Sequence, residues 1–166
     1  MKKIIIMFGL LFINVSNILS QEKISLQFLS ILSIKNEIRI KFEFENISDK
    51  DIALYIPTSQ DICRQIFKIK FISIKDSTVH TYEPCTWYTD LSYIRLDCRN
   101  SIILMPKEKK IINMNLSKKH FSPFLRKDTS YKVLLEVYLK DINIQSIFSN
   151  YFNEDISSNY LIFKNY

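Results

Sequence analysis

Glycine is almost missing from this sequence: it occurs once in 166 residues, as Gly9. Phosphate-binding loops, dinucleotide-binding fingerprints and nucleophile elbows need glycine, because their backbones turn through positive φ or approach a ligand closely. None of these motifs can be drawn on the chain. The sequence therefore gives no basis for the enzyme classes that depend on them, and we expect a protein without catalytic activity.

Histidine is also scarce, and its two copies, His80 and His120, have no metal-type spacing such as His-Glu-x-x-His. His80 falls in a short expected strand and His120 in a basic loop, so we expect both to be structural or solvent-exposed. A cysteine–histidine pair is the one catalytic arrangement that the composition still permits. We therefore assign no catalytic residue, no metal site and no cofactor from the sequence.

A basic stripe, the usual mark of a nucleic-acid binder, is missing as well. The formal charge of +6 comes from 23 Lys and Arg against 17 Asp and Glu, and the two signs are interspersed. Two short basic runs stand out, at 107–110 and 118–120. We interpret them as solvated turns, with attraction to an anionic surface as the alternative. No nucleic-acid partner is expected.

The N-terminal segment, 1–20, has the parts of a secretory signal. Met1-Lys2-Lys3 is basic, residues 4–13 are apolar, and small polar residues lead to Ser20. The apolar run is shorter than the about 20 residues of a transmembrane helix. We expect cleavage after Ser20, which leaves residues 21–166 as one exported domain, periplasmic or extracellular, without a membrane span. An uncleaved membrane anchor is the alternative.

Alternation of apolar and charged residues is strongest over residues 37–46. Because successive side chains on a strand point to opposite faces, the apolar residues of this stretch share one face, which we expect to be buried. Residues 131–139 repeat the pattern, although Leu134 and Tyr138 make their outer face partly apolar. Other strands are expected at 24–33, 52–56, 67–74, 78–82, 101–105, 110–116 and 158–164.

About seven to nine short strands in one domain predict an all-β protein. The expected architecture is an antiparallel immunoglobulin-like β-sandwich, with a small up-and-down β-barrel as the alternative. The short connection between 37–46 and 52–56 predicts that these two strands pair. No helical period is sustained beyond the expected signal, and only 117–126 and 143–152 leave room for a short helix.

Five stretches of the chain resemble small secreted bacterial immunoglobulin-like domains in their order. They are the strand ending in "FENIS", the apolar strand that ends at Pro57, the element "LMPKEKKIINMNL", the strand "YKVLLEVYL" and the terminal "SSNYLIFKN". The resemblance implies strand B at 37–46, strand E at 110–116, strand F at 131–140 and strand G at 158–164. Asp128-Thr129-Ser130-Tyr131 is close to a tyrosine corner, one residue short of the usual spacing.

Three cysteines, Cys63, Cys85 and Cys98, allow three single bridges, each of which leaves one thiol over. In an exported protein a disulfide is the more common use of cysteine. A hairpin of 67–74 with 78–82, centred near Asp76, brings Cys63 toward Cys85, so this pairing is favoured. Cys85–Cys98 is the alternative, as a clasp on an irregular loop.

Aromatic residues gather between 82 and 93, where the strand pattern breaks down: Tyr82, Trp87, Tyr88 and Tyr93. Aromatics on a constrained loop form a plausible contact surface. In the other interpretation Trp87 covers one end of the core.

These observations favour a non-catalytic exported module that binds an unknown protein or cell-envelope component through loops at one end of the sandwich. One alternative is a protease inhibitor that presents the loop at 83–100. Another is a small-ligand carrier with a barrel cavity.

Overall fold

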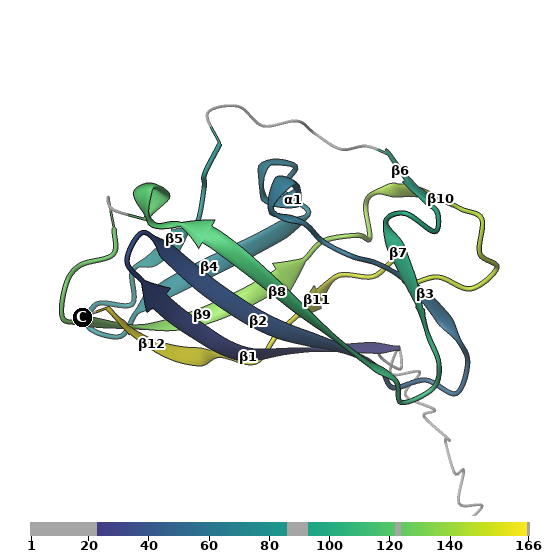
Figure 1. Ribbon diagram of the computed structural model, residues 1–166, viewed down its shortest axis with the longest axis horizontal. Helices are drawn as coiled ribbons and strands as arrows, with labels where there is room; N and C mark the ends of the chain where they lie inside the picture. The colour runs from purple at the N-terminus through teal and green to yellow at the C-terminus, as the bar shows by residue number, and fades with distance from the viewer. Residues whose placement is uncertain (1–22, 86–92, 122–123, 166) are drawn as a thin grey trace, which may run out of the picture.

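Two antiparallel sheets packed face to face form the body of the protein (Figure 1). The computed structural model describes residues 23–85, 93–121 and 124–165, so the expected signal at 1–20 lies outside the described residues. The first sheet has the order β1 (Ile24–Ile34), β2 (Glu37–Asn46), β8 (Lys109–Ser117). In the second sheet β9 (Thr129–Val137) pairs with β4 (Phe67–Ser73) on one edge and with β11 (Ile156–Ser157) and β12 (Leu161–Asn165) on the other, and β5 (Val79–Thr81) pairs with β4.

The sheet orders confirm the expected all-β, immunoglobulin-like sandwich. In the lettering of that fold the first sheet is A-B-E and the second is G-F-C-C′. Strand B pairs with strand E from Glu37 to Glu45, with Ile40 opposite Met114, and F pairs with G, with Tyr131 opposite Phe163. The barrel alternative is wrong, because the two sheets share no strand among the described residues. The alternative of a small-ligand carrier therefore lacks the barrel cavity on which it was based.

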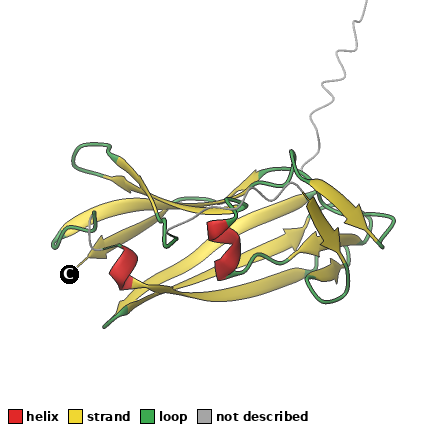
Figure 2. Ribbon diagram, turned by 90° about the horizontal axis from the view of Figure 1, so that it is seen from above, coloured by secondary structure: helices red, strands yellow, loops and turns green. Residues whose placement is uncertain are grey.

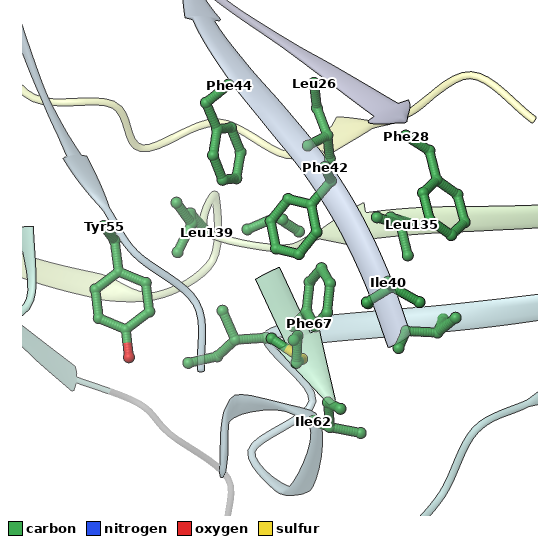
Figure 3. Packing of buried hydrophobic residues seen from close by; sticks show 14 of the residues in the cluster. Leu26, Phe28, Ile40, Phe42, Phe44, Tyr55, Ile62, Phe67, Leu135 and Leu139 are labelled. Atoms are coloured by element: carbon green, nitrogen blue, oxygen red, sulfur yellow. The ribbon is translucent and has the colours of Figure 1, made fainter. Parts of the chain in front are cut away.

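Strand β2 supplies the centre of the core, as its alternation predicts. Its four apolar side chains, Ile38, Ile40, Phe42 and Phe44, are fully buried. The Phe42 ring stacks on Phe67 of the second sheet, with ring centroids 5.4 Å apart (Figure 3). On the outer face the Lys109 ammonium binds the Glu43 carboxylate at 2.9 Å and the Glu45 carboxylate at 3.3 Å.

A tyrosine corner fixes the start of β9, although its sequence spacing is one residue short. The Tyr131 hydroxyl donates to the Phe124 carbonyl at 2.9 Å and accepts the Arg126 N–H at 2.9 Å. The Tyr131 ring is buried. The loop between β8 and β9 is therefore tied to the core by one side chain.

The described residues form twelve strands rather than the expected seven to nine, because the connections contain further short strands. Strand β3 (Ile52–Tyr55) pairs with β7 (Ser101–Leu104), and β6 (Tyr93–Leu96) pairs in parallel with β10 (Asn143–Ser146). The predicted pairing of 52–56 with 37–46 is wrong, because β1 and β8 already occupy both edges of β2. The short helix allowed at 143–152 is also wrong, because residues 143–146 form strand β10, which pairs with β6.

Two short helical turns lie on the side of the sandwich that Figure 2 views. The 3-10 turn η1 (Lys118–His120) falls within 117–126, where a short helix was allowed. The α-helix α1 (Ser59–Cys63) was not expected. Its signal is in the sequence, because Thr58 and Asp61 form a capping box in which each side chain accepts from the backbone N–H of the other residue.

In the described part of the chain, five tight turns place a non-glycine residue in the left-handed region, as a glycine-poor chain requires: Lys35, Gln65, Ser77, Lys107 and Asp128. Each such residue costs about 1 kcal/mol relative to a conformation with negative φ. Lys107, with φ 65°, sits in the turn that leads into β8.

We expect Lys107→Gly to raise the free energy of unfolding by about 0.5–1 kcal/mol, because glycine adopts this conformation without a clash. Urea unfolding followed by circular dichroism measures the change. Lys110→Gly is the matched control: Lys110 lies inside β8, where glycine should destabilise by about 1 kcal/mol. Equal destabilisation by both substitutions would show that the backbone at Lys107 is not strained.

Candidate binding surface

One end of the sandwich carries the three long connections of the fold (Figure 1). They are the β2–β4 connection with β3 and α1, the β5–β8 connection with β6 and β7, and the β9–β11 connection with β10. The short strands of these connections lie together at this end. In immunoglobulin variable domains the B–C and F–G loops of one end form the binding site, and the corresponding connections here are the first and the third.

Backbone hydrogen bonds lock the first and third connections together. The Ala53 N–H donates to the Asn150 carbonyl at 3.0 Å, and the Phe152 N–H donates to the Ala53 carbonyl at 2.9 Å. The Asn150 side-chain amide donates to the Asp51 carbonyl at 2.5 Å. Since main-chain atoms make most of these bonds on both sides, this end of the molecule is a fixed surface rather than a set of independent loops.

The second connection is attached to both of the others. Strand β7 pairs with β3, and the Ile56 N–H donates to the Asn100 carbonyl at 3.0 Å. The Ile147 N–H donates to the Leu96 carbonyl at 3.2 Å, which continues the pairing of β6 with β10. Segments that are far apart in the chain are thus joined at one place.

A groove of about 320 Å³ opens where the three connections meet. We call it the end groove; its lining residues are Asp51, Ala53, Ile103, Ile147, Phe148, Ser149 and Asn150. Ile103 and Ile147 are 53% and 61% exposed, although both are large aliphatic side chains. A second hollow of about 570 Å³ shares Asn150 with the end groove, and its lining includes the charged residues Lys23, Asp49 and Lys50.

The turn between β6 and β7 is held by Asp97. Its carboxylate accepts the Arg99 N–H at 2.9 Å and the Arg99 guanidinium at 2.7 Å. These hydrogen bonds from the side chain and backbone of Arg99 lower the pKa of Asp97 to about 2. The turn thereby presents the exposed side chains of Cys98 and Arg99 beside β7.

The structure separates the aromatic residues that were expected to form a contact loop. Tyr82 is buried: its ring stacks on Phe121, with centroids 4.1 Å apart, and burial raises its pKa. Tyr93 is exposed on β6, where its hydroxyl donates to Gln145 of β10 at 3.0 Å. Trp87 and Tyr88 lie outside the described residues, as does much of the loop at 83–100. Of the four, Tyr93 is the one that the structure places on the surface at this end.

A disulfide joins Cys63 to Cys85, with Cα atoms 5.6 Å apart. The favoured pairing is confirmed, and the Cys85–Cys98 alternative is wrong, because Cys98 is a free, exposed thiol. The hairpin register that suggested the pairing is also present, with Phe71 opposite His80. The bridge ties α1 to the chain that leaves β5.

We expect the double substitution Cys63→Ser and Cys85→Ser to lower the free energy of unfolding by about 3 kcal/mol, because it frees a closed loop in the unfolded chain. Urea unfolding measures the loss. Cys98→Ser is the matched control and should change stability by less than about 0.5 kcal/mol. A double variant as stable as the wild-type protein would contradict the structural role of the bridge.

A hydrogen-bond network is centred on Asp61, a fully buried residue of α1. The Asp61 carboxylate accepts the Tyr55 hydroxyl at 2.8 Å, the Thr58 N–H at 2.6 Å and the Thr58 hydroxyl at 2.8 Å, and it pairs with the Arg64 guanidinium at 3.3 Å. Burial, and then the charge of Asp61, raise the pKa of Tyr55. Sequence reasoning missed this network, although the Thr58-x-x-Asp61 spacing signals it.

The two histidines are packed against aromatic rings. His80 stacks on Phe124, with ring centroids 4.8 Å apart, and His120 lies edge-on to Tyr82 at 6.2 Å. Within the described ranges no group of three or more His, Cys, Asp and Glu side chains could hold a metal ion. In the same part of the chain, no helix has the length and apolar character needed to cross a membrane.

No protein-family model matches this chain, and no curated protein matches it. Among the solved structures that align with it are two of β-glucosidase from Kluyveromyces marxianus, one in complex with glucose and one of the selenomethionine-labelled protein. Their sequence identities are 14% and 15%, and each has a TM-score of 0.34. The alignments cover 86% of this chain and 15% of the enzyme chain. At this TM-score the likeness supports no inference about activity.

Proposed function

We propose that this protein is an exported, non-catalytic binding module that recognises a protein or cell-envelope component through its end groove. The observation that carries the proposal is the pair Ile103 and Ile147, both more than half exposed on a surface fixed by main-chain hydrogen bonds. Large aliphatic side chains in a polar-rimmed hollow are typical of contact sites. Asp51 and Asn150 supply the polar rim.

The rigidity of the end groove favours recognition. Binding costs free energy when loops and side chains must be ordered, and a surface that is already ordered avoids much of that cost. Here the hydrogen bonds of Ala53 and Asn150 hold two connections in place before any partner arrives. The core strands β2 and β9 have no large exposed apolar side chain, so an apolar contact at this end must come from the connections.

Export is supported by two independent features. The Cys63–Cys85 disulfide is typical of proteins that fold in an oxidising compartment. The basic, apolar and polar segments of residues 1–20 have the order of a secretory signal. The A-B-E and G-F-C-C′ sheet orders support a kinship with small secreted bacterial immunoglobulin-like domains, which we include in the proposal.

Affinity capture with matched variants tests the function. Wild-type protein, the double variant Ile103→Asp with Ile147→Asp, and the control Ile111→Asp are immobilised and exposed to envelope and medium fractions. Ile111 is exposed on the outer face of β8 and does not line the end groove. Circular dichroism checks that all three are folded, and mass spectrometry quantifies what each retains.

We expect one or more partners to be retained by the wild-type protein and by Ile111→Asp. Retention by the double variant should fall roughly tenfold or more, since two charges replace desolvated aliphatic side chains in the contact. The purified partner must then bind the wild-type protein with the same dependence on Ile103 and Ile147. Equal retention by the double variant and the control would refute the end groove as the site.

A further inference from the structure

The outer face of the second sheet carries a row of side chains that its pairing brings into line. Ile162 of β12 lies opposite Lys132 of β9, Lys132 lies opposite Ile72 of β4, and Ile72 lies opposite Val79 of β5. Residues directly opposite one another on paired strands share a face. The next residues along the strands, Phe71, Val133 and Phe163, are buried in the core, so the row faces outward.

This row is apolar and uncovered. Ile162 is 62% exposed and Val79 is 55% exposed, and Ile72 between them is half-buried. Ile74 is exposed as well, and its N–H donates to the Ser130 carbonyl, which places it one row further along the same face of the sheet. We call Ile72, Ile74, Val79, Lys132 and Ile162 the outer patch. The row alone spans three strand spacings, about 14 Å.

The outer face of the first sheet has a different character. Along β2 it presents Glu37, Arg39, Lys41, Glu43 and Glu45, with ion pairs from Arg39 to Glu37 and from Lys109 to Glu43. A solvated sheet face normally looks like this, with polar side chains outward. Leu32, Ile34 and Ile111 are also exposed on the first sheet, but each lies opposite a charged residue of β2. The second sheet instead carries three aliphatic side chains in one row that Lys132 alone interrupts, which is the expected mark of a contact surface.

The outward-facing charged residues of β4 and β9 are three lysines and one glutamate, and Asp76 is exposed in the turn between Ile74 and Val79. Lys132 stands in the middle of the row, is exposed, and makes no ion pair with a described residue. The one carboxylate on this face of β9, Glu136, is neutralised by the Lys70 ammonium at 2.7 Å and accepts the Tyr138 hydroxyl at 2.5 Å. The Lys68 ammonium lies 4.8 Å from the centre of the Tyr138 ring.

The composition of the outer patch distinguishes between possible occupants. The centres of protein–protein interfaces are enriched in aromatic residues and Arg and depleted in Lys, whereas this patch combines Ile, Val and Lys. A second copy of the chain would set Lys132 and its neighbouring lysines against the same lysines. An anionic lipid surface suits both features, because phosphate groups attract lysines and aliphatic side chains enter the headgroup boundary.

From this juxtaposition we infer that the outer patch docks the protein onto an anionic lipid surface. The aliphatic row of Ile72, Val79 and Ile162 contacts the headgroup boundary, and Lys132 and Lys68 bind lipid phosphates. The long stems of the lysines let their charges reach the phosphates while the row stays in contact. The end groove belongs to other elements, so the inference does not depend on the proposed function.

Co-sedimentation with lipid vesicles tests the inference, with protein recovered from the exported fraction of cells that express the whole gene. One set of vesicles contains phosphatidylglycerol and phosphatidylcholine, and the other contains phosphatidylcholine alone. The variants are Lys132→Glu and the pair Val79→Ser with Ile162→Ser. Their matched controls on the first sheet are Lys41→Glu and Ile111→Ser, and sedimentation velocity reports the oligomeric state of each.

We expect binding to the phosphatidylglycerol vesicles that weakens with added salt, and little binding to phosphatidylcholine alone. Lys132→Glu should weaken it roughly tenfold or more, and the Ser pair roughly fivefold, while the controls stay within about twofold. Absence of vesicle binding, equal binding to both vesicle types, or equal losses in the controls would overturn the inference. A dimer that the patch variants dissociate would overturn it too, and would assign the face to a second copy.

Discussion

Phe42→Asp leaves the protein unfolded at room temperature. Phe42 is fully buried on β2, with its ring stacked on Phe67 at 5.4 Å and edge-on to Phe44 at 5.8 Å. Figure 3 shows that side chains from both sheets surround it, among them Leu135. No polar group of the described core is placed to receive a carboxylate there, so the new charge would have to stay buried without a partner.

Two costs combine at this position. Removing a buried phenylalanine ring costs about 3–5 kcal/mol through lost contacts and the cavity that remains. An uncompensated buried charge adds several kcal/mol more, unless the carboxyl takes up a proton. Because a domain of this kind has a total stability of about 5–15 kcal/mol, the sum is comparable with the whole free energy of folding.

The neighbouring position supplies the control. Lys41 points to the solvent face of the same strand and makes no ion pair with a described residue. Lys41→Asp should therefore change the free energy of unfolding by less than about 1 kcal/mol. Far-ultraviolet circular dichroism and urea unfolding compare the two variants. A folded Phe42→Asp protein with a cooperative transition near that of Lys41→Asp would show that β2 is not buried on this face.

The strands of the two main sheets are predictable because their information is local. The alternation in β2 and β9 fixes which face of each strand is buried, and the short turns at Lys35 and Asp76 fix antiparallel partners. The Cys63–Cys85 bridge follows from the same hairpin register. Because Phe71 lies opposite His80 in an antiparallel pair, Cys63 before β4 comes close to Cys85 after β5. Such features need no knowledge of distant segments.

The end groove and the outer patch depend on distant partners and were therefore not predictable. Strand β6, Tyr93–Leu96, pairs in parallel with β10, Asn143–Ser146. The two strands are far apart in the sequence, so no turn between them predicts this pairing. Leu134 and Tyr138 showed that the outer face of β9 is partly apolar. The row from Ile162 to Val79 still requires the registers of three strand pairs, which the local pattern does not contain.

Asp61→Ala should cost about 3–5 kcal/mol, the second largest effect, because it removes a buried carboxylate and leaves several hydrogen-bond donors without an acceptor. Asp61 has no exposed surface, and four donors converge on its carboxylate: the Tyr55 hydroxyl, the N–H and hydroxyl of Thr58, and the Arg64 guanidinium. Without it, the buried Tyr55 hydroxyl and the Thr58 N–H both lose their hydrogen bonds. The capping box that begins α1 is lost at the same time, which alone costs about 1 kcal/mol.

Asp49→Ala is the control that distinguishes the loss of the buried Asp61 network from the loss of an exposed carboxylate. Asp49 is exposed in the turn after β2, and its removal should change stability by less than about 0.5 kcal/mol. Asp61→Asn, which keeps the shape and one carbonyl oxygen, should fall between the two. Urea unfolding at neutral pH ranks the three variants. If Asp61→Ala were as mild as Asp49→Ala, α1 would not depend on its buried carboxylate, and the Cys63–Cys85 bridge would be the main restraint on the helix.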